Sequence, residues 1–199
     1  MKYKRIGFDL DHTLIDYSSS INFLAEQFGF HAKSKEEAKR YYEGSDLGDV
    51  GWQDFQSALY TDGLRFARVN PGADALIRRL VADGTKVFII SHKTEYSNRG
   101  NQRASLRTAA SSFLALHGFS PGPVAAENVF YADDRTSKVS KIRELSLDLF
   151  VDDLPEVLEN PEIPDSTLKV LYDPGEVHAA SSLFRVREFW ELESSIFEG

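Results

Sequence analysis

The sequence contains no cysteine among its 199 residues. Without thiols the chain has neither a disulfide framework nor a thiolate metal site, and nothing indicates an oxidising compartment. Long hydrophobic runs are also missing, because no segment approaches the ~18 apolar residues that a membrane-spanning helix needs. An acidic pair follows the first few residues before any signal-length apolar stretch develops. We therefore expect a cytoplasmic protein with no membrane partner.

Positive charge is scarce as well. The chain has 23 Lys and Arg against 31 Asp and Glu, which gives a formal net charge of -8. An acidic chain has no broad attraction for a phosphate backbone, so we expect no nucleic acid polymer as a partner. What is present, 42% hydrophobic and 27% charged residues, is typical of one globular domain with at most a small insertion.

Short apolar segments rich in β-branched and aromatic residues alternate with longer segments of helical periodicity. Because their apolar character is nearly continuous, the pattern predicts strands that are covered on both faces and pair in parallel. Helical connections between them favour an α/β fold, a three-layer sandwich with a parallel Rossmann-like sheet. The predicted strands span residues 3–9, 86–91, 128–132, 147–153 and 168–173.

Helix signals surround these strands. Asn70 is a candidate cap, Pro71 suits a first turn, and Gly84 ends the apolar periodicity of the segment between them. A second helix is predicted from residue 135 onward, directly before the strand at 147–153. The segment 176–197 has the pattern of one amphipathic helix that packs on the sheet.

Residues 17–69 do not follow the alternation of strands and helices. They contain no convincing strand pattern, but helix-like pieces occur around 20–28, 34–43 and 52–60. We interpret 17–69 as an inserted helical cap subdomain, with residues 1–16 and 70–199 forming the α/β core. The insertion leaves the core just after the first strand, so the cap is expected to overhang that strand's carboxyl end.

The stretch "IGFDLDHTLID", residues 6–16, concentrates carboxylates directly after an apolar run. In an extended chain alternate residues face the same way, so Asp9, Asp11 and Thr13 are expected to converge. Neighbouring carboxylates repel one another in a partly buried site unless a cation or a proton lies between them. The pattern therefore indicates a compensating group.

Other strand ends carry complementary residues. Ser91 follows one predicted strand, and Asp152 and Asp153 end another. Open parallel sheets bind ligands outside the carboxyl ends of their strands, so these side chains are expected to meet. Carboxylate oxygens suit Mg²⁺, whereas five scattered histidines and the lack of cysteine argue against zinc. The candidate Mg²⁺ ligands are Asp9, Asp11, Asp152 and Asp153.

Four motifs occur in a set order: "FDLDHT" at one strand end, a serine at the next, a lysine at a helix start and "VDD" at a later strand end. In order and spacing they resemble the haloacid dehalogenase superfamily over residues 1–16 and 70–173. In that family a helical cap follows the first motif. The matching residues are Asp9 to Thr13, Ser91, Lys138, and Asp152 with Asp153.

The resemblance implies a role for each matched residue. Asp9 attacks phosphorus and forms an aspartyl-phosphate, and Asp11 is the general acid and base. The carboxylate at Asp11 points to phosphoryl chemistry, because dehalogenases that attack carbon lack it. Ser91 donates a hydrogen bond to the phosphoryl group. Lys138 neutralises charge beside Asp9, with Lys141, one helical turn later, as the alternative.

Further residues near the motifs are weaker candidates. Thr13 is expected to orient Asp9 or its loop. His92 and Lys93, directly after Ser91, are candidate contacts for the leaving group or phosphate, with an exposed loop as the alternative. Asp133 and Asp134 form a second acidic pair, which we interpret as capping residues because the family has no catalytic carboxylates there.

The resemblance implies a Mg²⁺-dependent phosphatase that hydrolyses a small phosphorylated metabolite. A phosphotransferase using the same aspartyl-phosphate is the first alternative. The second is a catalytically silent binding protein, although such a protein has no need to keep both Asp9 and Asp11. A phospho-receiver domain gathers similar groups, but there the phosphorylated aspartate ends a middle strand and here it ends the first.

Overall fold

The structure is a computed structural model that describes residues 3–97, 99, 104–178 and 181–198. Its centre is a six-stranded sheet in the order β5-β4-β1-β6-β7-β8, in which every pairing is parallel. The predicted fold class, a three-layer α/β sandwich, is confirmed. The strands are β1 (Arg5–Phe8), β4 (Lys86–His92), β5 (Val129–Ala132), β6 (Leu149–Asp152), β7 (Leu168–Tyr172) and β8 (Phe184–Val186).

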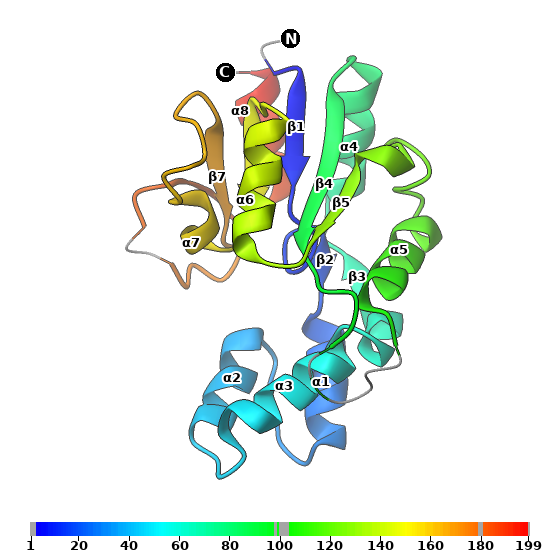
Figure 1. The fold of residues 1–199 in the computed structure, drawn as a ribbon, viewed down its shortest axis with the longest axis vertical. Helices are drawn as coiled ribbons and strands as arrows, with labels where there is room; N and C mark the ends of the chain where they lie inside the picture. Colours follow the sequence, from blue (N-terminus) through cyan, green and yellow to red (C-terminus); the bar gives the residue numbers. More distant parts are fainter. Residues whose placement is uncertain (1–2, 98, 100–103, 179–180, 199) are drawn as a thin grey trace.

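Helices cover both faces of this sheet (Figure 1). One face carries α4 (Ala73–Ala82), α5 (Leu106–Leu116) and α8 (Phe189–Phe197), whose buried side chains join a single apolar cluster. The other face carries α6 (Arg135–Glu144) and α7 (Pro155–Leu158). A short 3₁₀ helix, η2 (Ala126–Asn128), precedes β5. Among the described residues, no helix combines the length and the apolar character that crossing a bilayer requires.

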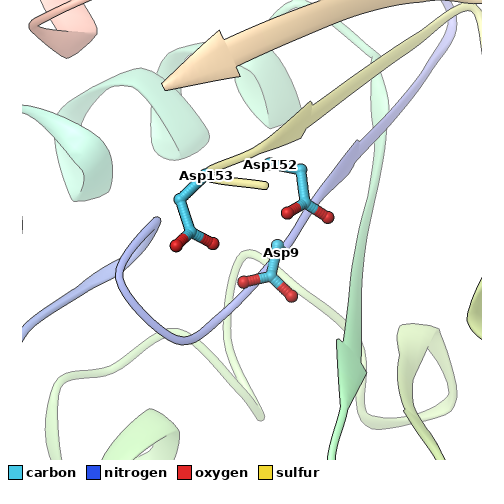
Figure 2. Close-up of side chains that lie close together, drawn as sticks. All are labelled: Asp9, Asp152 and Asp153. Carbon is cyan, nitrogen blue, oxygen red and sulfur yellow. The ribbon is translucent and has the colours of Figure 1, made fainter. Parts of the chain in front are cut away.

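The carboxyl ends of β1, β4 and β6 lie at the same edge of the sheet because these neighbouring strands run in parallel. Asp9 follows β1 directly, and its N–H donates to the Val151 carbonyl at 2.8 Å. Asp152 ends β6 and Ser91 lies near the end of β4. Figure 2 shows the carboxylates of Asp9, Asp152 and Asp153 gathered at this edge.

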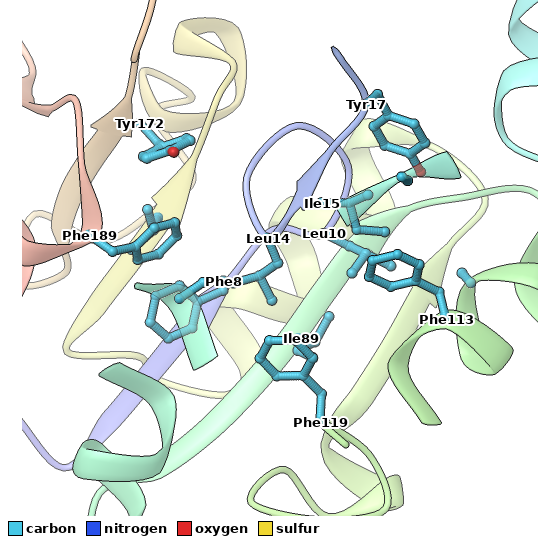
Figure 3. Packing of buried hydrophobic residues seen from close by; sticks show 14 of the residues in the cluster. Phe8, Leu10, Leu14, Ile15, Tyr17, Ile89, Phe113, Phe119, Tyr172 and Phe189 are labelled. Carbon is cyan, nitrogen blue, oxygen red and sulfur yellow. The ribbon is translucent and has the colours of Figure 1, made fainter. Parts of the chain in front are cut away.

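Strand side chains alternate between two apolar clusters. In β4, Val87 and Ile89 belong to the cluster under α4 and α8, whereas Phe88 and Ile90 belong to the cluster under α6 and α7. Figure 3 shows part of the first cluster, in which the ring centroids of Phe8 and Phe189 lie 6.3 Å apart. Burial on both faces is why these strands read as continuous apolar runs.

Gly7 permits a close approach inside the second cluster. A Cβ at this position would lie 2.5 Å from Leu147 Cδ1 and 2.8 Å from a Phe150 ring carbon. Contacts this short are repulsive, so a larger residue would push β1 away from β6. The glycine therefore keeps Asp9 next to the end of β6.

Residues 18–66 form a helical layer beyond the carboxyl ends of the strands (Figure 1). It consists of α1 (Ser18–Gln27), α2 (Lys35–Glu43), α3 (Gly48–Leu59) and the 3₁₀ helix η1 (Asp62–Phe66). Its interior is aromatic, because Phe30, Tyr42 and Phe55 contact one another with ring centroids 5.3–5.9 Å apart. A two-stranded antiparallel ribbon, β2 (Ile15–Asp16) with β3 (Arg68–Val69), joins this layer to the sheet.

Asn70 has a different role from the predicted helix cap. The helix α4 begins at Ala73, and Gly72 before it has φ of +85°. Asn70 Nδ2 instead donates to the Thr13 carbonyl at 2.6 Å, and its backbone N–H donates to the Leu14 carbonyl at 2.9 Å. Both bonds tie the returning chain to the loop that follows Asp9.

We expect Asn70→Ala to lower the free energy of unfolding by about 1–3 kcal/mol, because the buried Thr13 carbonyl loses its side-chain donor. Denaturant unfolding followed by circular dichroism measures this loss. Asn22→Ala, on the exposed side of α1, is the matched control and should leave the stability unchanged or slightly higher. Equal stabilities of both variants would contradict the proposed importance of this bond.

The prediction of one continuous helix over 176–197 is wrong. The segment contains β8, which pairs with β7, and α8 begins only at Phe189. Val186 and Phe189 are buried, but Phe184 and Trp190 are 43% and 58% exposed. The outer backbone groups of β7 need hydrogen-bond partners, and strand pairing supplies them where local periodicity alone favours a helix.

Candidate active site

Three carboxylates meet at the carboxyl edge of the sheet. Asp9, Asp152 and Asp153 each offer one oxygen, and these oxygens lie within 4.8 Å of one another. Asp9 and Asp152 are buried, whereas Asp153 is partly exposed. Such a group of hard oxygen donors is the ligand type that Mg²⁺ prefers.

Lys138 places an ammonium group between two of these carboxylates. Its Nζ lies 2.5 Å from Asp9 Oδ1 and 2.6 Å from Asp152 Oδ2. The position follows from the start of α6, where the Asp134 side chain accepts from the Ser137 N–H at 2.7 Å and caps the helix. Lys141 pairs instead with Glu144 at 2.6 Å, so the geometry brings Lys138 to Asp9.

The cluster carries more negative than positive charge. Burial raises the pKa of Asp9 well above its ordinary value, and Lys138 offsets this effect only in part because Asp152 and Asp153 add repulsion. Burial likewise raises the pKa of Asp153 to about 6, against the opposing charge of Lys35. Lys138 itself stays charged, because the two carboxylates outweigh the effect of burial and raise its pKa. A divalent cation therefore fits these residues.

The Asp11 carboxylate does not join the group of three oxygens among the described residues. Lys93 Nζ lies 2.8 Å from its Oδ2, and the Tyr17 hydroxyl donates to its Oδ1 at 2.6 Å. Burial favours a higher pKa of Asp11, but the charge and hydrogen bond of Lys93, with the bond from Tyr17, lower it. Asp11 is thus an ionised carboxylate that lies beside the cluster of Asp9, Asp152 and Asp153.

The remaining predicted substrate contacts divide into two groups. Ser91, which is buried, and His92, which is exposed, both line the cavity above Asp9. Thr13 is buried beneath the loop and does not line that cavity. Its hydroxyl has no hydrogen-bond partner among the described residues. The structure therefore places Ser91 and His92 where a ligand can reach them, but not Thr13.

A cavity of about 490 Å³ lies between the core and the helical layer. Asp9, Asp11 and Lys138 lie on its core side, and Lys35 from α2 and Tyr60 at the end of α3 lie on the other. This volume is in the range of sites that enclose a small molecule. The carboxylates of Asp9 and Asp11 therefore face this cavity.

Sequence reasoning gave no role to several residues of this site. Lys35 Nζ lies 3.4 Å from Asp153 Oδ2, which connects the helical layer to the carboxylate cluster. Tyr17 reaches Asp11, and His12, with φ of +64°, contacts the Tyr17 and Tyr60 rings. Burial lowers the pKa of His12 to about 3, so its imidazole is neutral. Lys93, in contrast, is a predicted candidate contact for the leaving group or phosphate, and the structure shows it buried with its Nζ beside Asp11.

Comparison with known proteins identifies the fold of the chain. No family model and no curated protein matches the sequence. Solved structures do match. A predicted phosphatase from Clostridium acetobutylicum superposes with a TM-score of 0.65 at 14% identity, covering 100% of both chains. A haloacid dehalogenase-like family hydrolase from Streptococcus pneumoniae gives 0.64 at 12% identity, covering 98% of this chain and 99% of the other.

The chain has the haloacid dehalogenase fold. Protein Tyrosine Kinase A from Mycobacterium tuberculosis also matches, with a TM-score of 0.65 at 13% identity over 98% of this chain and 99% of that one. Asp9 directly follows β1 in this fold, which is where the sequence resemblance expects the nucleophile, and that role stays a prediction. Ser91 lies near the end of β4, Lys138 lies in the first turn of α6, and Asp152 with Asp153 lies at the end of β6.

Proposed function

We propose that the chain is a Mg²⁺-dependent phosphatase that hydrolyses a small phosphomonoester through an aspartyl-phosphate at Asp9. The observation that carries the proposal is the placement of Asp9 between Lys138 and the carboxylates of Asp152 and Asp153, at the floor of a cavity. A carboxylate that only caps a strand needs neither a buried ammonium partner nor an enclosed space above it.

Asp9 is the nucleophile in this proposal. One of its oxygens attacks phosphorus, the bond from phosphorus to the leaving oxygen breaks, and water later attacks the resulting acyl phosphate. Lys138 holds the Asp9 carboxylate in place, because its Nζ contacts Asp9 Oδ1 at 2.5 Å. Ser91 lines the same cavity and donates a hydrogen bond to a phosphoryl oxygen.

Asp11 serves the proton transfers. Its ionised state in the structure suits the second step, in which a carboxylate takes a proton from the attacking water. The first step with an alkyl leaving group requires a proton on Asp11, whereas an aryl oxide leaves without one. An aryl phosphate is therefore the best first substrate, because its hydrolysis does not require a protonated Asp11.

Asp9, Asp152 and Asp153 are the residues that hold Mg²⁺ in this proposal, since their unbalanced charge fits a divalent cation. When bound, the ion offsets charge on the transferring phosphoryl group. The sequence pattern predicts the Asp11 carboxylate as a further ligand, but in the structure this group is paired with Lys93 and Tyr17 and is not needed for this set.

We expect hydrolysis of 4-nitrophenyl phosphate that requires Mg²⁺, falls to background in EDTA and returns with excess Mg²⁺. The physical reason is that the carboxylates repel the anionic substrate until a cation compensates them. Nitrophenolate absorbance measures the rate, and Ca²⁺ at equal ionic strength is the control for charge screening alone. Equal rates in EDTA and in Mg²⁺ would remove the metal from the proposal.

Phosphotransfer to another acceptor is the second candidate function. One of the structures with the same fold is named a tyrosine kinase, which is a kind of phosphotransferase. The two functions differ in what attacks the aspartyl-phosphate. An added acceptor alcohol that speeds nitrophenolate release without raising free phosphate would favour transfer, whereas equal amounts of both products would favour hydrolysis.

A further inference from the structure

Charge is segregated across the catalytic cavity. The helical layer contributes Lys35 and Lys39 to the cavity wall but no carboxylate among the described residues. This is unexpected in a chain of net charge -8, whose helical layer is rich in Asp and Glu. On the core side, the cavity lining outside the acidic cluster includes one more cation, Arg135, and one more carboxylate, Glu156. The surplus positive charge therefore lies on the wall opposite Asp9.

The two lysines lie on one face of α2, because residues four apart in a helix are neighbours. Lys35 pairs with Asp153. Among the described residues, the one ion pair of Lys39 is with Glu43, at 3.8 Å, and the side chains of this pair are 57% and 58% exposed. Exposed pairs of this kind are weak and are readily exchanged for a ligand. Lys39 lies four residues, or about 6 Å, farther along the helix than Lys35.

The neighbouring face of α3 completes this wall. Trp52, Gln56 and Tyr60 follow one another at intervals of four residues and all line the cavity, with Gln53 beside them. Amide and indole groups bind a polar, uncharged framework, but they do not neutralise a charge. Among the described residues of the helical layer, Lys39 is thus the cavity-lining cation whose ion pair is mostly exposed to solvent, whereas the Lys35 pair is mostly buried.

We infer that the leaving group of the substrate carries a second anionic group, a carboxylate or a second phosphate, which Lys39 binds. The inference rests on the proposed phosphoester chemistry and names the class of its substrate: a small phosphomonoester with negative charge at both ends. One end lies at Asp9, Ser91 and Lys138, and the other lies at the exposed turn of α2. A cavity of about 490 Å³ accommodates such a molecule.

The test compares substrates that differ in one charge. 3-Phosphoglycerate is paired with glycerol 1-phosphate, and propane-1,3-diyl bisphosphate with 3-hydroxypropyl phosphate, so the two arms separate carboxylate from phosphate. We expect kcat/KM to favour the anionic member of at least one pair about tenfold, the low end for a hydrogen bond to a charged group. In Lys39→Gln the ratio should fall to about one, whereas Lys33→Gln, on the same layer outside the cavity, should keep it.

Calorimetric titration of the Asp9→Asn variant with the same pairs, in Mg²⁺, gives a readout that does not need turnover. Tighter binding of the anionic member, lost when Lys39→Gln is added, supports the inference even if no phosphoester is hydrolysed and the proposed function fails. Equal affinities within each pair, or a preference that survives Lys39→Gln, would overturn the inference even if aryl phosphate hydrolysis is rapid.

Discussion

Asp9→Asn is expected to lower the rate of aryl phosphate hydrolysis by on the order of 10³-fold or more, because an amide does not form the covalent phosphoryl intermediate. The side chain keeps nearly the same shape, and Lys138 keeps its contact with Asp152 at 2.6 Å. The nitrophenolate assay in Mg²⁺ measures the loss. Asp83→Asn, an exposed carboxylate at the end of α4, is the matched control and should retain the wild-type rate.

The same substitution should not destabilise the protein in the absence of metal. Burial and the neighbouring carboxylates raise the pKa of Asp9 in the folded chain, so its ionised form lowers the stability of the fold at neutral pH. A neutral amide removes that penalty, and we expect the thermal midpoint in EDTA to be equal or higher. If the variant is inactive and its thermal midpoint is clearly lower, the lost activity is explained by unfolding. If it turns over substrate near the wild-type rate, the covalent mechanism is wrong.

The sheet could be predicted because buried parallel strands leave a strong pattern. The segments around β1, β4 and β6 are short, almost wholly apolar and followed by polar residues, which marks both the strands and the edge where ligands bind. In contrast, β8 has only three residues, and its pairing with β7 depends on contacts distant in sequence. Local periodicity carries no record of such contacts.

Strand alternation was a good guide to the site only as far as the strand extends. Because β1 ends at Phe8, the chain turns through Asp11 to His12, and the Leu14 and Ile15 N–H groups both donate to the Leu10 carbonyl. Asp11 therefore meets Lys93 and Tyr17, and the shared face predicted for Asp9 and Asp11 does not carry both into the carboxylate cluster.

The contribution of the helical layer was the least predictable part. Lys35 begins an ordinary amphipathic helix, and its sequence neighbours give no sign that its ammonium group reaches Asp153. The contact arises because the β2–β3 ribbon returns the chain over the strand ends. The division into a core and a cap stays a prediction, and the Lys35 contact shows how closely the two parts share one site.

Lys138→Met is expected to lower the free energy of unfolding by about 3–5 kcal/mol in EDTA, since it leaves buried carboxylates without their cation. Asp9 and Asp152 are 4% and 0% exposed, so water does not replace the lost ammonium group. Aryl phosphate hydrolysis should fall by about 10²–10³-fold, because charge on the transferring group also loses its stabilisation. Denaturant unfolding and the nitrophenolate assay give the two measurements.

Lys141→Met separates this effect from the general loss of a lysine on α6. Its ammonium group pairs with the exposed Glu144, so the change in stability should stay within about 1 kcal/mol. Mg²⁺ provides the decisive comparison, because a cation bound by Asp9, Asp152 and Asp153 replaces part of the missing charge and stabilises the folded state by mass action. Mg²⁺ should therefore raise the midpoint of Lys138→Met more than that of the wild type or of Lys141→Met. Equal shifts in all three proteins would mean that Mg²⁺ binds elsewhere, and that the ammonium group of Lys138 is not what balances these carboxylates.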